Sequence, residues 1–598
     1  MILLSNTFPL GRGGEGVIPQ FPLTVSDLAV IIGYLLLVLG IGLYFRGRMR
    51  SAEDYFAGGH RIPWWLAGIS HYISSASALT FVAYSQLGYT SGLVSIAVAW
   101  TAVPGCILGG LFFAHRWRQA RVSTPVEFLE RRFGFFVRQL MVWAGIPMKV
   151  AEDGLKLFAT SLFLAVGLHI PVSWAVLACG AIAMVYTFLG GLWALAVTDY
   201  VQFLMKALAL LLLVPLAIWR AGGLVHAAGA LPHGFLHVTD AAHSWTYIAG
   251  FVVMLTITLN GSWSLAQKFY SVEDSHQARK AAFLSAALYL VATPMMILPA
   301  ILGRLFLPNL IAQHHTADVY VFLMISLLPA GMVGIIVAAL LSATMATVSA
   351  DFSVIAGVLT RDVYQRLFRP DASAAHLLRT GRLITLLVGS ASVGIGLYLS
   401  RGGDQPILHL MVIIASAFLA PSFLPLLGAL ASRRLTGRGV ILGFFLGLST
   451  GLGLLAARAW LLPHGYWPWL RTNFDGVSIL INTGMTMLGM WLGSLASVSS
   501  EASSRSYDAI FGTPEPNPAP ASVAGEHAGV QTVIAFATLT VAALLGLAGL
   551  LAPTASARAA DLSIAFLIST LGGHRLACTR RRVQAAASQE SPHSEVKS

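Results

Sequence analysis

Apolar runs separated by short polar connections occupy most of the sequence. A helix needs about 20 apolar residues to cross the hydrocarbon core of a bilayer, which is roughly 30 Å thick. By this criterion the pattern predicts about fourteen transmembrane helices, over residues 23–46, 62–88, 91–115, 136–168, 172–191, 194–220, 245–264, 281–307, 320–360, 380–400, 406–429, 438–461, 474–496 and 529–552. We therefore expect an all-α polytopic membrane protein.

The composition agrees with this interpretation and excludes a soluble enzyme. Of the 598 residues, 56% are hydrophobic and only 10% are charged, whereas an ordinary soluble domain has about 25% charged residues. A globular core of this length could not bury so many apolar side chains, so they need lipid around them.

The net charge of +12 raises the question of nucleic-acid binding, and the position of the charges argues against it. Arginine and lysine are spread over alternate loops, within residues 46–61, 116–138, 268–280, 361–382 and 433–438. A nucleic-acid-binding surface would gather them on one face. By the positive-inside rule these loops are cytoplasmic, which places the N-terminal segment 1–22 outside.

Two regions lie outside the hydrophobic body. Residues 497–528 are rich in Ser, Pro, Ala and acidic residues, and we expect them to form a mobile cytoplasmic linker. Residues 553–598 form a polar tail that contains Arg580, Arg581 and Arg582. The predicted topology places this triplet outside, against the rule, unless residues 561–578 dip into or cross the membrane.

The second predicted span is unusually polar. It carries the hydroxyls of Ser70, Ser74, Ser75, Ser77 and Thr80 within about three helical turns. A helix interrupted at 74–77 would free backbone carbonyls for a cation and amides for an anion, as in transporters with discontinuous helices. Alternatively, the hydroxyls bond to their own helix or allow tight helix packing.

Two other spans contain acids and hydroxyls that lipid should exclude. Asp199 follows the Gly190-Gly191 connection by about two turns. It is either a cation ligand or proton relay, or a cap of its own helix. The span 320–360 carries Asp351 together with hydroxyls at Ser342, Thr344, Thr347 and Ser349. Hard cations prefer such oxygens, although small residues also serve helix packing.

The fourth span contains Lys149, Glu152, Asp153 and Lys156. Spacings of three and four residues place each lysine beside both acids on one helix face. Such a cluster is costly in lipid and should face the protein interior. It is either a structural ion-pair ladder or part of a substrate site.

Several motifs together resemble the sodium:solute symporter family, which includes carriers of proline, sugars, pantothenate and sialic acid. The resemblance covers roughly residues 23–500. The matching segments are Asp54–Gly59 before Trp64-Trp65, Thr124–Gly134, Tyr186–Gly191 with Thr198–Gln202, Trp263 with Gln267-Lys268, and Ala343–Asp351 running into Thr360–Tyr364.

The resemblance implies a five-plus-five inverted-repeat core with discontinuous helices, the first repeat over residues 62–220 and the second over 245–429. Residues 23–46, 438–496 and 529–552 are then peripheral helices. Solute is expected near the midplane, beside two broken helices. Substrate-binding candidates are Ser74, Ser75, Ser77, Thr80, Lys149, Lys156, Trp263 and Gln267.

The family's main sodium site, carried over by its motifs, uses backbone carbonyls of Ile73, Ala76 and Ala343 and the hydroxyl positions Ala346 and Thr347. Ala346 stands where the family usually has serine, so one hydroxyl ligand is missing. A second sodium site of some members would use Asp199 and three serines, of which only Ser349 retains its hydroxyl. We therefore expect Asp199 and Ser349 to serve ion coupling and not a complete second site.

The resemblance implies symport of sodium ion with a small polar solute, an organic anion, amino acid or sugar, by alternating access. Ala99 and Thr80 occupy positions where several sugar carriers have glutamate and glutamine, which disfavours a hexose. Proton coupling through Asp199 or His71 and a transporter-like sensor are the alternatives.

An enzyme is disfavoured, because the Lys149–Lys156 cluster lacks a nucleophile or a metal-ligand pattern. As partners we expect the solute and membrane lipids in the plasma (inner) membrane, but no nucleic acid and no obligate protein.

Overall fold

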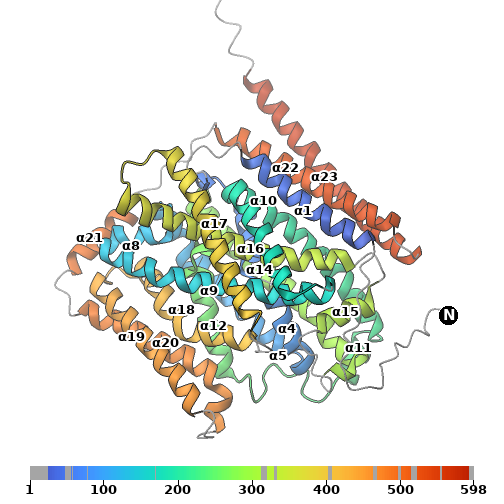
Figure 1. Ribbon diagram of the computed structural model, residues 1–598, viewed down its shortest axis with the longest axis horizontal. Coiled ribbons are helices and arrows are strands. Elements are labelled where there is room, and N and C mark those ends of the chain that lie inside the picture. The colour runs from blue at the N-terminus through green and yellow to red at the C-terminus, as the bar shows by residue number, and fades with distance from the viewer. Residues whose placement is uncertain are drawn as a thin grey trace, which may run out of the picture.

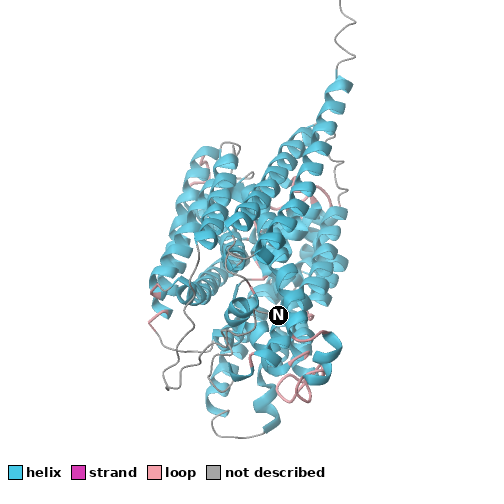
Figure 2. Ribbon diagram, turned by 90° about the vertical axis from the view of Figure 1, so that its right-hand side faces the viewer, coloured by secondary structure: helices cyan, strands magenta, loops and turns pink. Residues whose placement is uncertain are grey.

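The computed structural model describes residues 25–46, 55–56, 58–76, 78–168, 170–310, 319–328, 333–401, 407–461, 468–495, 500–512, 522–551 and 555–590. All regular structure in these residues is helical (Figure 2). The α-helices are α1 (Val25–Arg46), α3 (Trp64–Ser75), α4 (Ala78–Ser91), α5 (Val94–Ala99), α6 (Ala102–Leu108), α7 (Ala114–Gln119), α8 (Pro125–Phe133), α9 (Phe135–Leu168), α10 (Val172–Arg220), α11 (Leu224–Ala230), α12 (Trp245–Gly261), α13 (Trp263–Tyr270), α14 (Ser275–Phe306), α15 (Val319–Leu327), α16 (Val333–Val358), α17 (Ala374–Leu399), α18 (Ile407–Ala431), α19 (Gly437–Leu461), α20 (Pro468–Leu495), α21 (Ser500–Phe511), α22 (Ser522–Leu551) and α23 (Ala555–Glu590). Shorter 3₁₀ or π segments are η1 (Gly58–His60), η2 (Gly109–Phe113), η3 (Pro308–Leu310) and η5 (Leu359–Phe368).

The expected all-α membrane architecture is confirmed. Within the described residues, 11 helices are long and apolar enough to cross a membrane, or up to 13 if each of two bent pairs is one span. The difference from the predicted number has local causes. Helix α9 carries four charged residues at its centre, the apolar helix Val172–Val185 is short, and Leu562–Thr579 adds a span that the hydropathy pattern left open.

Two spans are broken, and both breaks bend the chain sharply. Helices α3 and α4 meet at 64°, where Ala76 adopts an extended conformation with φ −123° and ψ 91°. Helices α12 and α13 meet at 55°, where Ser262 is extended with φ −60° and ψ 133°. The first break falls within the serine-rich stretch that predicted it.

The connection at Gly191 requires glycine. Its φ is 56°, in the left-handed region that favours glycine. A Cβ at this position would lie 2.8 Å from Tyr55 Cδ2 and 2.9 Å from the Tyr55 carbonyl oxygen. The backbone of this connection therefore packs directly on Tyr55.

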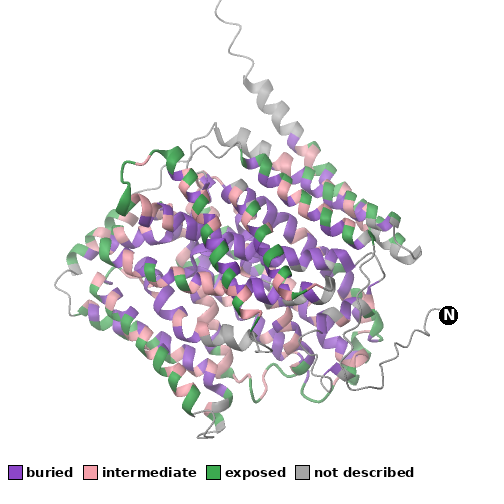
Figure 3. Ribbon diagram, in the orientation of Figure 1, coloured by how far each residue is buried: buried purple, intermediate pink, exposed green. Residues whose placement is uncertain are grey.

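Helix α16 is the central element of the bundle (Figures 1 and 3). Its most apolar stretch is buried throughout, and it contacts α1, α3, α9, α10, α13 and α17. At one edge of the molecule α1, α22 and α23 lie side by side, whereas α19 and α20 pair at the opposite edge (Figure 1). The prediction of one continuous span over residues 320–360 was wrong, because α15 and α16 are separate helices.

The expectation that residues 497–528 form a mobile linker was wrong for its first part. Helix α21 packs against α8 through Phe511, whose ring centroid lies 6.0 Å from that of Phe128. Arg132 places its guanidinium 4.9 Å from the Tyr507 ring centroid. Aromatic and cation–π contacts therefore hold the segment against the bundle. Residues 522–528 of the predicted linker begin α22, and residues 497–499 and 513–521 lie outside the described residues.

Candidate functional site

The break between α3 and α4 opens onto a cavity of about 240 Å³ inside the bundle. Its walls come from α3, α4, α5, α6, α9, α10, α12, α13, α14, α16 and α18. Polar and charged residues in the lining include Ser74, Ser75, Thr80, Lys149, Glu152, Lys156, Lys206, Ser262, Thr347 and Asp351. Of the predicted substrate-binding residues, five therefore line one cavity, while Ser77 lies outside the described residues.

Asp199 of α10 is buried against the last two turns of α3, which directly precede the break. One carboxylate oxygen, Oδ2, accepts hydrogen bonds from the hydroxyls of Ser70 and Ser74, the latter at 3.2 Å. Lys268 Nζ of α13 lies 3.5 Å from the same oxygen. The other oxygen, Oδ1, has no hydrogen-bond partner among the described residues. Asp199 therefore joins α10 to both broken spans and does not cap its own helix.

The expected sodium ligands come from two helices in contact with each other. Ile73 lies in the last turn of α3, and Ala76 is the residue directly after this helix. The carbonyl of Ile73 accepts a hydrogen bond from the Ala76 amide at 3.2 Å. Ala343, Ala346 and Thr347 lie on the buried helix α16, which packs against α3. Ala76 and Thr347 both line the cavity.

The hydroxyls of Thr347 and Ser349 on α16 bond to their own helix. Thr347 Oγ1 donates to the Thr344 carbonyl at 2.9 Å. Ser349 is buried, outside the cavity lining, and its hydroxyl donates to the Met345 carbonyl at 2.5 Å. Thr347 is thus the α16 hydroxyl among these residues that lies at the cavity wall.

The charged face of α9 pairs with α16. Lys149 Nζ lies 3.0 Å from Asp351 Oδ1 and 3.1 Å from Glu152 Oε2. Lys156 Nζ lies 2.9 Å from Asp351 Oδ2, 2.9 Å from Glu152 Oε1 and 3.3 Å from Asp153 Oδ1. The predicted ladder within α9 is present, and Asp351 adds a third acid that sequence spacing alone did not assign to it.

Comparison with known proteins identifies the family. The sequence model described as "Sodium:solute symporter family" matches residues 55–447, which is well over half of the chain. The chain belongs to the sodium:solute symporter family. It is a secondary active transporter that couples sodium ion to uptake of a small polar solute, as its motifs led us to expect.

Similar curated proteins are also symporters. The chain is 24% identical to the sodium/sialic acid symporter NanT of Aliivibrio fischeri over 71% of this chain and 87% of that protein. It is 25% identical to the sodium/glucose cotransporter of Vibrio parahaemolyticus over 62% of this chain and 76% of that protein. By their names, both relatives are sodium-coupled transporters.

Solved structures confirm the fold. A sodium-coupled sialic acid symporter in a substrate-bound outward-open state matches with a TM-score of 0.68 and 19% identity, over 79% of this chain and 98% of that one. Mhp1, a nucleobase-cation-symport-1 family transporter, matches with a TM-score of 0.50 and 15% identity, over 76% and 98%. The symporter fold is an inverted-repeat core whose discontinuous helices here are α3/α4 and α12/α13.

Two predicted residues of this symporter lie outside the cavity lining. Trp263 is buried, and its ring fills the space over Gly145, where an added Cβ would lie 2.5 Å from Trp263 Cζ2. Gln267 Nε2 donates to the carbonyl of Phe56 at 2.6 Å. Trp263 therefore packs α13 against α9, and Gln267 joins α13 to the segment before η1.

His71, the alternative proton carrier, also lies away from the cavity lining. Its two ring nitrogens contact the Ser285 hydroxyl at 3.0 Å and the Leu259 carbonyl at 2.9 Å. The ring stacks on Phe269 with centroids 4.8 Å apart. Both nitrogens are thus used in joining α3 to α12 and α14.

Lys206 was not among the site residues predicted from the sequence. This residue lies within the predicted span 194–220, where an ionisable side chain is a functional candidate by default. That same criterion selected Asp199 and could have selected Lys206 as well.

Proposed function

We propose that the solute binds in the cavity at the α3/α4 break and that sodium binds between the end of α3 and α16. The observation that carries this proposal is the meeting of Ala76, Ser74 and Thr347 at one cavity. A broken helix frees main-chain carbonyls for a cation, and polar side chains next to it can orient a solute. We assign the repeats to residues 62–220 and 245–429.

In this proposal, sodium is held by carbonyls of Ile73, Ala76 and Ala343 and by the Thr347 hydroxyl. Ala346 supplies no side-chain oxygen, so water completes the coordination or the affinity is reduced. Neutral oxygens suit a hard monovalent cation that must bind and leave in each cycle.

Asp199 acts in ion coupling. Its oxygen Oδ1 is a buried, unpartnered acceptor among the described residues, and Ser74 connects the carboxylate to the cavity wall. A cation passing this carboxylate would compete with Lys268 for its charge. Ser349 contributes to coupling through α16.

The solute is proposed to be a sugar or a sugar acid, because the relatives are named for sialic acid and glucose. Of the two, a sugar acid agrees better with Ala99 and Thr80, which disfavour a hexose. We place the protein in the plasma (inner) membrane with the N-terminus outside, from the positive-inside rule. Transport requires no catalytic residue, and lipids and solute are the proposed partners.

Uptake by full-length protein in proteoliposomes tests the proposal. An inward sodium gradient should drive accumulation of labelled N-acetylneuraminate or glucose, and an equal potassium gradient should not. Sodium should also raise the thermal unfolding midpoint of the purified protein relative to potassium at equal ionic strength, because a ligand that binds the native state stabilises it. Uptake and unfolding that are both indifferent to sodium would contradict the proposal.

A further inference from the structure

Lys206 is a buried cation at the break of the first discontinuous span. Lys206 is 2% exposed and lies on α10, about two turns after Asp199. Nζ lies 4.8 Å from the ring centroid of Tyr72 and 4.6 Å from that of Phe81. Tyr72 belongs to α3 and Phe81 to α4, so one ammonium contacts the aromatic residues on either side of the break.

The two rings are themselves held in place. Tyr72 packs edge-on against Tyr289 of α14, with ring centroids 5.0 Å apart. Phe81 packs edge-on against Tyr320 of α15 at 5.6 Å. These contacts position the two faces between which Lys206 lies, and they restrict where its ammonium can point.

Lys206 differs from the other lysines of the cavity. Lys149 and Lys156 each contact two or more carboxylates. Lys206 Nζ has neither an ion-pair partner nor a hydrogen-bond acceptor among the described residues. Cation–π contacts offset part of the cost of burying an ammonium, but its three N–H groups still favour oxygen acceptors.

The cavity offers space for such an acceptor. Lys206 and Tyr72 line it together with the hydroxyl residues Ser74, Ser75 and Thr80. An anionic group bound there would accept hydrogen bonds from the ammonium, and hydroxyls near it could bind the remaining polar groups of the same molecule.

We propose that Lys206 binds the carboxylate of the transported solute and that the solute is consequently an organic anion. This inference rests on the proposed function, because it takes the cavity as the solute site. The carboxylate oxygens accept from Lys206 Nζ, while Tyr72 and Phe81 keep the ammonium between the two halves of the broken span. Solute binding would thereby connect α10 with α3 and α4.

Paired ligands test the charge requirement. Thermal unfolding of purified full-length protein at fixed sodium concentration is measured with N-acetylneuraminate and its methyl ester, glucuronate and glucose, and lactate and lactamide. At least one acid should raise the unfolding midpoint, and its neutral counterpart should not. Lys206→Met should weaken the apparent affinity for that acid by about 10- to 100-fold, the effect of losing a charge-assisted hydrogen bond. Lys206→Arg should retain part of the affinity.

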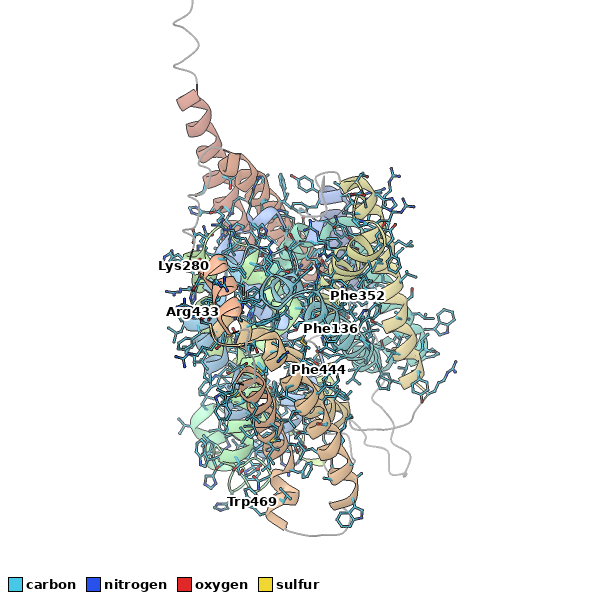
Figure 4. The ribbon with its side chains drawn as sticks, turned by 90° about the vertical axis from the view of Figure 1, so that its left-hand side faces the viewer. Phe136, Lys280, Phe352, Arg433, Phe444 and Trp469 are labelled. Atoms are coloured by element: carbon cyan, nitrogen blue, oxygen red, sulfur yellow. The ribbon has the colours of Figure 1, made fainter. Side chains whose placement is uncertain are left out.

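Lys280→Met is the matched control. Lys280 also lies over an aromatic ring, 5.8 Å from the centroid of Trp64, but it is exposed, lies outside the cavity lining and sits at the edge of the molecule in Figure 4. This variant should bind the acid as the wild type does. Sodium-induced stabilisation in Lys206→Met shows that this variant is folded.

The outcomes separate this inference from the proposed function. Binding only of neutral solutes, no binding of any acid in the panel, or acid binding that Lys206→Met leaves unchanged would each overturn the role of Lys206, even where sodium still drives uptake. Loss of all sodium dependence in the wild type would instead contradict the proposed function.

Discussion

Lys156 Nζ lies 2.9 Å from Asp351 Oδ2, which joins α9 to α16 by a buried ion pair. Asp351 follows Thr347 by about one helical turn, and both residues line the cavity. The pair therefore holds the proposed sodium helix against the charged face of α9. This relationship connects the stability of the bundle with the geometry of the site.

Replacing Asp351 by Asn should destabilise the protein by about 3 kcal/mol or more, because Lys149 and Lys156 lose a shared buried counter-charge. Denaturation of the purified protein in detergent measures this. Asp508→Asn is the control, since Asp508 pairs with Arg433 and both side chains are exposed. Arg433 lies at the edge of the molecule in Figure 4. A surface pair of this kind contributes less than about 1 kcal/mol. Equal effects of the two substitutions would argue against a structural role for the α9–α16 pair.

Asp199→Asn should lower the apparent sodium affinity of uptake by at least about 10-fold, an effect of more than 1 kcal/mol. The substitution removes the negative charge and leaves Lys268 buried without its counter-ion. Sodium titration of uptake in proteoliposomes provides the measurement. Asp27→Asn serves as a control, because Asp27 is an equally buried acid on α1 that accepts from the Gly334 amide at 2.6 Å. Unchanged sodium dependence in Asp199→Asn would exclude the coupling role.

The proposed sodium site predicts opposite effects for neighbouring residues on α16. Thr347→Ala removes a ligand oxygen and should weaken sodium binding by about 10-fold, the equivalent of about one hydrogen bond. Ala346→Ser adds a hydroxyl at the position where the family usually has one and should strengthen binding several-fold. Sodium-dependent thermal stabilisation reports both changes.

Ser353→Ala is the control for the sodium site. Ser353 is buried on the same helix but lies outside the cavity lining. Its substitution should leave the sodium titration unchanged. An Ala346→Ser variant that binds sodium less well than the wild type would place the site elsewhere.

Gly191→Ala should destabilise the protein by about 1–3 kcal/mol or prevent folding, because alanine is strained at a positive φ and its Cβ would lie 2.8 Å from Tyr55 Cδ2. Gly453→Ala is the contrasting case. Gly453 lies in α19 with nothing within 4 Å of an added Cβ, so alanine should stabilise its helix by up to about 1 kcal/mol. Unfolding midpoints in detergent compare the two. A Gly191→Ala variant as stable as the wild type would show that this connection can relax.

Motifs that hold local structure could be interpreted from the sequence, and the hydrogen bonds of the structure explain them. In the segment Thr124–Gly134, Thr124 Oγ1 accepts the Glu127 amide at 3.3 Å, and Glu127 Oε2 accepts the Ser123 amide at 2.9 Å. Such caps use residues a few positions apart, so spacing predicts them. The serine-rich break at 74–77 was similarly evident from local composition.

The amino-acid sequence was sufficient to predict the membrane class, most of the spans and the residues that lipid should exclude, because hydropathy is a local property and the bilayer penalises polar groups wherever they meet lipid. Which of those residues come into contact depends on the packing of the helices. Asp351 contacts Lys156, which lies 195 positions away in the sequence. Lys206 lies between the rings of Tyr72 and Phe81. Trp263 and Gln267 lie outside the cavity lining. These outcomes depend on how each helix is rotated and packed against its neighbours, which the apolar pattern of a mostly buried helix does not specify.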